Sequence, residues 1–137
     1  MLQLDGRLPN AEMARALKVS EGTVRRRLTR LIKDTIIRVV AVAEPEQLGF
    51  NTAAFIGLQV DPASVDSVAD QLCGLPETDQ VSITTGSFDI LISVNLESSE
   101  ALAEFLHQKI GKIEGIRQTG TFVSLETRKR GLRNSAA

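Results

Sequence analysis

The chain has 137 residues, of which 42 % are apolar and 24 % charged, a globular composition that excludes a disordered chain and fits one ordinary domain or two small ones. No apolar run reaches the roughly 18–20 residues of a membrane-spanning helix, and residues 1–7 lack the basic and then apolar order of a signal peptide. The single cysteine excludes an internal disulfide and fits a reducing compartment, so we expect a cytoplasmic protein without a membrane partner.

The net charge of −1 conceals two oppositely charged blocks. Residues 1–40 carry nine Lys or Arg and four Asp or Glu, a net charge of +5, which leaves −6 for residues 41–137. A basic block beside an acidic block suggests a module that binds polyanions next to one that avoids them. Chance clustering of charge on a solvated helix explains the same numbers, so charge alone does not decide between the two.

The basic block predicts two short helices joined by a tight turn. The first covers residues 10–17, with Asn10 as its N-cap. Ser20 is a suitable N-cap for a second helix, which runs to about Lys33. Apolar residues spaced by three or four positions predict the buried face of this helix: Val24, Leu28 and Leu31.

Two helices around a tight turn are typical of a helix-turn-helix, whose second helix enters the major groove while Arg and Lys contact phosphates. The alternative is an ordinary helical hairpin with a solvated basic face. The Ser20 cap and the run of three arginines after Val24 favour binding of double-stranded DNA. The residues expected at the DNA are Ser20, Glu21, Gly22, Thr23, Arg25, Arg26, Arg27, Arg30, Lys33 and Arg38.

A β-branched stretch at residues 36–43 predicts a strand or a short hairpin, and residues 44–49 then break the pattern. We therefore expect a DNA-binding domain at 1–43, a linker at 44–51, a second domain at 52–128 and a tail at 129–137.

The second domain alternates between strand and helix patterns. The expected order is strand, helix, strand, strand, helix, strand, which is the ferredoxin-like βαββαβ pattern of an α+β fold. In chain order we expect a strand at 53–60, a helix at 65–72, strands at 81–85 and 90–94, a helix that begins after Ser98 or Ser99 and ends at Gly115, and a strand at 116–125. Two helices cover only one face of such a sheet. Apolar residues on the other face, such as Phe55 and Leu91, need cover, which self-association would provide.

A glycine turn separates the second and third strands, at residues 84–89. Its exposed backbone N–H groups suit a small carboxylate, and Asp89 suits an ammonium group, so the two together would suit a free amino acid. The alternative is a plain hairpin, in which Gly86 supplies a positive φ and Asp89 caps the turn. Taken by themselves, these residues favour the plain hairpin.

No catalytic site, metal site or cofactor is expected. His107 is predicted on the surface of a helix, and Cys73 is predicted to be partly buried by packing. Neither has the partners that would build a nucleophile or a metal site, and no phosphate-binding loop is present.

Five stretches together resemble the Lrp/AsnC family, the leucine-responsive and asparagine-responsive "feast/famine" transcriptional regulators. Their order and spacing along nearly the whole chain make the resemblance specific, although each one alone is modest. They are Asp5-Gly6-Arg7, Ser20 to Leu28 with Arg30-Leu31, Ile36-Ile37-Arg38, Leu48-Gly49-Phe50 and Thr85 to Leu91.

The resemblance implies a winged helix-turn-helix followed by a ferredoxin-like ligand-sensing domain. It further implies homodimers that pair through the sheet and assemble, often to octamers, with an amino-acid effector held between dimers. Carried over to this sequence, Gly86 would offer backbone donors, Asp89 would bind the amino group and Phe88 would help to form an apolar wall. The effector residues so implied are Thr85, Gly86, Ser87, Phe88, Asp89, Thr119 and Thr121.

The sequence departs from the family at two points. Another helix usually precedes the Asp5-Gly6-Arg7 stretch, so either the start codon is misassigned or the reading domain lacks its first, supporting helix. Thr35 stands where a glycine commonly precedes the wing, so a different turn is expected there.

Three functions follow from these observations. The first is a transcriptional regulator that binds DNA and responds to an amino acid through dimer or octamer assembly. The second is an amino-acid-binding assembly module with an impaired DNA reader. The third is an enzyme like the haem-biosynthesis decarboxylases that resemble this family in fold, which the single histidine disfavours, so we expect no enzyme.

Overall fold

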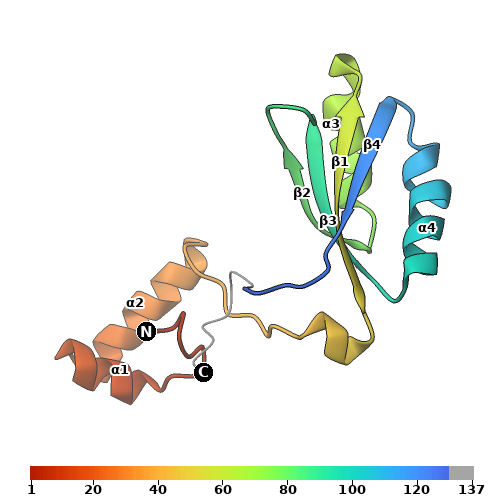
Figure 1. The fold of residues 1–137 in the computed structure, drawn as a ribbon. Helices are drawn as coiled ribbons and strands as arrows, with labels where there is room; N and C mark the ends of the chain where they lie inside the picture. Colours follow the sequence, from red (N-terminus) through yellow and green to blue (C-terminus); the bar gives the residue numbers. More distant parts are fainter. Residues whose placement is uncertain (130–137) are drawn as a thin grey trace. The chain divides into compact units, whose positions relative to one another are not determined.

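The computed structural model describes residues 1–129, which form two compact units (Figure 1). The N-terminal unit comprises Met1–Val42 and the C-terminal unit Ala43–Thr127. The predicted tail, residues 129–137, lies outside the described residues except for Lys129. Each unit has a hydrophobic core of its own.

The N-terminal unit is a pair of helices, α1 (Asn10–Leu17) and α2 (Glu21–Lys33). Its core is small: Met13, Ala14 and Val24 are buried, and Leu28 is among the partly buried residues that pack against them. Val24 therefore faces inward as its helical spacing predicts. The prediction that Asn10 caps α1 is wrong, because the helix already includes Asn10 and the preceding Pro9 is the N-cap, with a φ of −61° that its ring enforces.

The chain leaves α2 through a left-handed residue, Thr35, whose φ is +54°. Glycine adopts this conformation at little cost, whereas a β-branched residue is strained in it. The different turn expected at this position is therefore not required, because Thr35 takes up the conformation that suits a glycine.

The segment after this turn, residues 36–43, forms no strand, which corrects the strand or hairpin predicted there. A strand needs a neighbour for its backbone hydrogen bonds, and the described part of the N-terminal unit contains only helices. The apolar side chains of the segment are exposed: Ile36, Val39, Val40 and Val42.

The C-terminal unit is a four-stranded antiparallel sheet with strand order β2-β3-β1-β4, and two α-helices cover one of its faces (Figure 1). This is the predicted ferredoxin-like arrangement. Its elements are η1 (Pro45–Leu48), β1 (Thr52–Val60), η2 (Pro62–Ser64), α3 (Val65–Cys73), β2 (Thr78–Ile83), β3 (Ile90–Leu96), α4 (Ser99–Gln108), η3 (Ile110–Lys112) and β4 (Ile116–Val123).

Several element ends differ from the prediction. β2 begins at Thr78 and β3 ends at Leu96, three and two residues outside the predicted bounds, and β1 and α3 are each one residue longer. β2 stops at Ile83, because the Thr84 N–H already donates to the Asp89 carbonyl and closes the turn. α4 stops at Gln108 and is continued by η3, so Gly115, with a φ of +95°, belongs to the turn before β4. β4 ends at Val123, two residues early. At its other end α4 is capped as predicted, because Ser98 Oγ accepts the Ala101 N–H at 3.1 Å.

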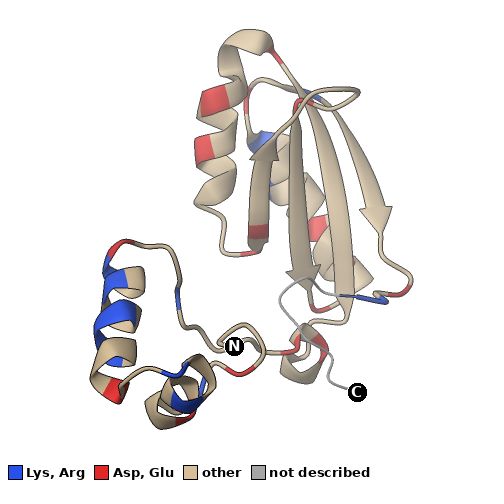
Figure 2. Ribbon diagram, turned by 90° about the vertical axis from the view of Figure 1, so that its left-hand side faces the viewer, with Lys and Arg blue, Asp and Glu red and all other residues tan. Residues whose placement is uncertain are grey.

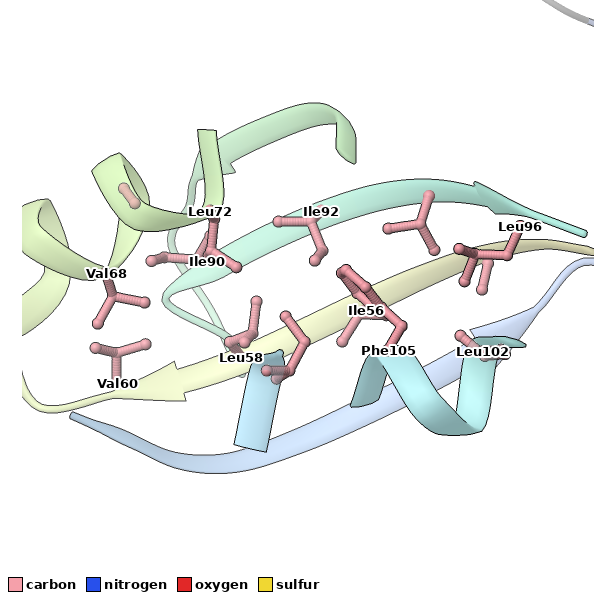
Figure 3. Close-up of a cluster of buried hydrophobic side chains, with 14 residues drawn as sticks. Ile56, Leu58, Val60, Val68, Leu72, Ile90, Ile92, Leu96, Leu102 and Phe105 are labelled. Carbon is pink, nitrogen blue, oxygen red and sulfur yellow. The ribbon is translucent and has the colours of Figure 1, made fainter. Parts of the chain in front are cut away.

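The core of the C-terminal unit lies between the sheet and the two helices (Figure 3). Alternate residues of β1 and β3 point into it, as the period of two along a strand requires. Figure 3 shows these side chains meeting those of α3 and α4. The labelled members are Ile56, Leu58, Val60, Val68, Leu72, Ile90, Ile92, Leu96, Leu102 and Phe105.

The opposite face, which we call the outer sheet face, is largely uncharged among the described residues, although the Asp79 carboxylate accepts a hydrogen bond from Asn95 of this face. Phe55 and Phe122 are cross-strand partners on this face and are 58 % and 57 % exposed, respectively, and Leu91 is 41 % exposed. The residues of the face are Ala53, Phe55, Gly57, Gln59, Gln80, Ser82, Leu91, Ser93, Asn95, Gln118, Gly120 and Phe122.

Within residues 1–129, no helix combines the length and the apolar character that crossing a membrane requires.

Candidate functional site

The turn between α1 and α2 is built as a tight helix connection. Lys18 ends α1 in the left-handed conformation, with a φ of +53°, and the Val19 N–H donates to the Ala14 carbonyl at 3.1 Å. Ser20 then caps α2, because its Oγ accepts the Thr23 N–H at 3.2 Å. The predicted cap is therefore confirmed, and the start of α2 is held in place by local contacts.

The basic side chains of α2 lie outside the core of the unit. Figure 2 marks the Lys and Arg positions as blue bands along both helices of the N-terminal unit, while the strands of the C-terminal unit are drawn almost entirely in the colour of uncharged residues. Every basic residue predicted at the DNA is exposed: Arg25, Arg26, Arg27, Arg30, Lys33 and Arg38. All but Arg38 belong to α2, and Arg38 lies in the segment that follows it.

Two of these arginines pair with an acid one turn away. The Arg25–Glu21 pair has an N–O distance of 3.7 Å, and the Arg30–Asp34 pair one of 3.4 Å. Arg25 and Arg30 have side chains that are 71 % and 84 % exposed, so such pairs contribute about 0–1 kcal/mol and exchange readily for another anion. In the described part of the chain Arg27 and Lys33 make no ion pair, so their charges face solvent.

The first turn of α2 presents small or polar groups. The Thr23 hydroxyl lies 2.9 Å from Ser20 Oγ and accepts from Arg26 Nη2 at 3.4 Å. A Cβ on Gly22 would meet no atom within 4 Å, so packing does not require this glycine and the backbone beside it is open to a ligand. The start of α2 is open and flanked by arginines. Such a helix start can enter the major groove of DNA, where it reaches the base edges while the arginines contact the phosphate backbone.

The loop between β2 and β3, residues 84–89, is held in a defined conformation by β1. Asp89 Oδ2 accepts the Val60 N–H at 2.8 Å, and the Asp89 N–H donates to the Leu58 carbonyl at 2.9 Å. Gln59 Nε2 donates to the Ser87 carbonyl at 3.0 Å. One oxygen of the Asp89 carboxylate is therefore used within the fold, by a bond to β1 and not by the cap of the turn that the plain-hairpin alternative predicts.

The backbone N–H groups at the tip of this loop are not used in holding its conformation. The backbone N–H groups of residues 85–88 donate no hydrogen bond within the described residues, and Gly86 has a φ of +106°. Thr85, Gly86 and Ser87 are exposed. The tip therefore offers unpaired N–H groups of the kind that bind a small carboxylate.

The other predicted effector residues do not gather around the loop within one chain. The Phe88 ring lies on the outer sheet face, where a Cβ on Gly57 would come within 2.5 Å of it. Thr119 and Thr121 pair with Leu58 and Ile56, whose side chains are buried on the helix side of the sheet. Phe88 and the two threonines thus lie on opposite faces, and one chain alone does not form a closed pocket from all of them.

The residues considered for catalysis remain apart. His107 is exposed, as predicted. Cys73 is also exposed, which corrects the prediction of partial burial: it is the last residue of α3, one position beyond the inward-facing Leu72. Within residues 1–129 no cluster of three His, Cys, Asp or Glu side chains could hold a metal ion.

Sequence reasoning missed a cavity of about 510 Å³ in the C-terminal unit. Apolar and acidic residues line it, among them Leu48, Phe50, Glu77 and Asp79. Burial tends to raise the pKa of the Glu77 carboxyl, but its hydrogen bond to Lys109, a backbone hydrogen bond and the Lys109 charge outweigh burial and hold the pKa below its ordinary value. The lining residues come from segments far apart in the chain, so no local sequence pattern predicts this cavity.

Sequence profiles of two families match the chain. The profile of the Lrp/AsnC ligand binding domain matches residues 53–133, and that of the AsnC-type helix-turn-helix domain matches residues 1–32. The first match alone covers more than half of the chain.

Individual relatives agree with the profiles. The chain is 39 % identical to an uncharacterised HTH-type transcriptional regulator of Pyrococcus abyssi, over 96 % of this chain and 84 % of the relative. It is 42 % identical to another from Pyrococcus furiosus, over 95 % of this chain and 88 % of the relative.

Solved structures agree as well. The structure of AsnC from E. coli matches with a TM-score of 0.86 and 30 % identity, over 93 % of this chain and 87 % of that one. A transcriptional regulator of Neisseria meningitidis, crystallised as a complex with L-methionine, matches in fold with a TM-score of 0.87 and 23 % identity, over 94 % of this chain and 86 % of that one.

Proposed function

The chain belongs to the Lrp/AsnC family of transcriptional regulators, which are not enzymes, and we propose that it binds specific double-stranded DNA and responds to an amino-acid effector through self-assembly. The observation that carries the DNA part is the exposed basic surface of α2 behind a Ser20-capped start. A regulator acts where the DNA is, so we place this one in the cytoplasm.

DNA binding through α2 assigns two kinds of contact. The residues of its first turn face the base edges in the major groove, and the basic residues contact phosphates on either side. The proposed interface consists of Ser20, Glu21, Gly22, Thr23, Arg25, Arg26, Arg27, Arg30, Lys33 and Arg38.

Binding to promoter DNA, measured at several salt concentrations, tests this interface. We expect Arg27→Ala to weaken binding to every DNA sequence and to reduce the salt slope by about one. Lys112→Ala, at an exposed position of the C-terminal unit, should leave both unchanged. A flat salt response of the unaltered protein, or equal binding to random DNA, would overturn the proposal.

An amino acid is the proposed effector, and its site includes the loop at residues 84–89. The unpaired N–H groups at the tip suit its carboxylate, and the second oxygen of Asp89 suits its ammonium group. The L-methionine complex of the Neisseria protein supports this class of ligand. Because one chain does not close the pocket, a second chain completes it in this proposal. The proposed residues are Thr85, Gly86, Ser87, Phe88, Asp89, Thr119 and Thr121.

A second copy of the chain is the proposed partner of the outer sheet face. Its exposed aromatic and aliphatic residues favour burial, and its low charge limits the repulsion between the same face of two copies. The exposed apolar segment 36–43, which has no strand beside it in its own unit, supports pairing with a second chain as well. Dimers formed in this way assemble further, to octamers, in the proposed active state.

Thermal unfolding with each of the twenty amino acids, combined with light scattering, tests both parts. We expect one or a few amino acids to raise the melting temperature and to change the molecular mass. Phe55→Asp should give a monomer, whereas Glu104→Lys, an exposed change on α4, should not. Stabilisation by an amino acid without any DNA binding would favour the alternative, an assembly module with an impaired reader. If none of the twenty amino acids changed the melting temperature or the molecular mass, the proposal of an amino-acid effector would be overturned.

A further inference from the structure

Two glycines of the outer sheet face form a slot for the Phe88 ring. A Cβ on Gly57 would lie 2.5 Å from Phe88 Cδ2, and one on Gly120 would lie 2.8 Å from Phe88 Cζ. Close-packed interiors do not tolerate such distances, so any other residue at either position would displace the ring. Neither glycine has a positive φ, whereas three other glycines among the described residues do. These two positions therefore need glycine to leave space for the Phe88 ring, and not for a special backbone conformation.

The slot is continuous with the surface that we assign to a second copy. Gly57 and Gly120 are cross-strand partners, as are Phe55 and Phe122 beside them. The rings of Phe88 and Phe122 lie edge to face, with centroids 6.3 Å apart and an interplanar angle of 82°. If the Phe88 ring left its slot, the two glycines would leave a hollow in the outer sheet face, and packing by a second copy would suffer.

The same ring belongs to the loop that we assign to the effector. Phe88 stands between Ser87 and Asp89, and its carbonyl accepts a hydrogen bond from Thr84 Oγ1 at 2.8 Å. With the ring seated, the backbone on both of its sides is fixed to β1 through Gln59 and Val60. The position of one side chain thus decides both the shape of the outer face and the arrangement of the N–H groups at the loop tip.

We propose that Phe88 is a positioning residue that couples the effector loop to the outer sheet face, an inference that rests on the proposed function. A second copy and the effector both bind the state in which the ring occupies the slot. Each of them therefore raises the population of that state, and by linkage each strengthens the binding of the other. Phe88 touches neither the carboxylate nor the ammonium group of the effector in this arrangement.

Hydrogen exchange of the loop amides tests the coupling without any effector. The amides followed are those of Val60, Thr84 and Asp89, whose hydrogen bonds fix the loop to β1 and close its turn. Their exchange, called loop exchange below, is measured in the full-length protein at concentrations below and above that of dimer formation. Dimer formation in the unaltered protein should slow this exchange by about tenfold, a typical size for coupling between two sites. In Phe88→Ala and in Gly57→Ala the change should be less than about twofold.

Two further variants separate the coupling from misfolding and from loss of the dimer. Phe122→Ala removes a ring of the same face outside the loop, so it should raise the concentration needed for the dimer and yet reach the same slowing of loop exchange. The double variant Gly57→Ala with Phe88→Ala removes the clash and should fold even if Gly57→Ala alone does not. It should also lack the coupling.

The outcomes distinguish the coupling from the function on which it rests. A chain that stays monomeric at all concentrations would overturn the proposed assembly and the coupling together. A dimer whose loop exchange is unchanged, or a Phe88→Ala variant whose loop exchange slows as in the unaltered protein, would overturn the coupling alone. If an amino acid from the thermal series binds, its affinity should rise about tenfold on dimer formation in the unaltered protein and stay constant in Phe88→Ala.

Discussion

The two units of the molecule differ most in how much each of them buries. Among the described residues, the core of the C-terminal unit contains fourteen buried apolar side chains and that of the N-terminal unit three. Isolated helices as short as α1 and α2 are marginal in water and depend on such contacts. We infer that the unit with the DNA-binding surface is the first to open, while the sheet remains a stable platform.

The largest effect is expected in the core of the sheet. Ile56 is fully buried in β1, and Ile56→Ala should lower the free energy of unfolding by about 4 kcal/mol, because it removes apolar contacts and leaves a cavity. Chemical denaturation followed by circular dichroism measures this loss. Thr121→Ala, at the exposed cross-strand partner of Ile56, should change it by less than about 0.5 kcal/mol. Equal losses for the two variants would contradict the assigned core.

A smaller and more local effect is expected in the N-terminal unit. Met13 is 5 % exposed, and Met13→Ala should cost about 2–3 kcal/mol. Because the two cores are separate, amides of α1 and α2 should lose protection from hydrogen exchange while those of β1 and β3 keep theirs. If the sheet amides lost protection by the same factor, the units would unfold as one and the comparison would fail.

Each unit has a helix capped by a serine, so the loss of one cap can be compared between the two units. Ser20→Ala and Ser98→Ala each remove a serine that accepts a backbone N–H, at about 1 kcal/mol each. We expect a visible loss of helicity and of DNA binding for Ser20→Ala, whereas the larger core around α4 should hide the effect of Ser98→Ala. Circular dichroism at increasing temperature measures the difference, and an earlier loss of helicity in Ser98→Ala would reverse the comparison.

The smallest effect concerns the Glu77–Lys109 ion pair of the C-terminal unit. The pKa of Glu77 lies below its ordinary value of 4.5, so its ionised form stabilises the fold above that pH. The unaltered protein should therefore be more stable than Glu77→Gln at pH 7, by at most about 1 kcal/mol, and this advantage should disappear as the pH falls below about 4.5. An advantage that did not shrink at all as the pH fell below about 4.5 would show that packing, and not charge, is its cause.

Periodic patterns predicted most of the C-terminal unit. Alternation along β1 and β3 identified their buried faces, because a strand between two others has only one way to place such a pattern. The strand predicted at residues 36–43 failed for a related reason, since β-branched composition describes a preference and a strand also needs a neighbour. Cys73 was misplaced because one residue at a helix end turns the side chain out of the core.

The candidate sites were predictable only where they are local. The Ser20 cap and the arginines of α2 follow from a dozen consecutive residues. The position of Phe88 does not, because its slot is made by Gly57 and Gly120, which the sequence separates by more than sixty residues and the β1–β4 register brings together. The hydrogen bond from the Val60 N–H to Asp89 depends on the same kind of long-range contact.

The left-handed Thr35 at the end of α2 has a mechanical consequence. A threonine at positive φ costs about 1–2 kcal/mol relative to its relaxed conformation, but the well that it occupies there is narrow. A glycine would relieve the strain and would widen the range of directions in which the chain can leave the helix. Thr35 therefore lowers the stability of the N-terminal unit slightly but restricts the backbone after α2. We expect Thr35→Gly to make that unit more stable and the segment that follows α2 more flexible.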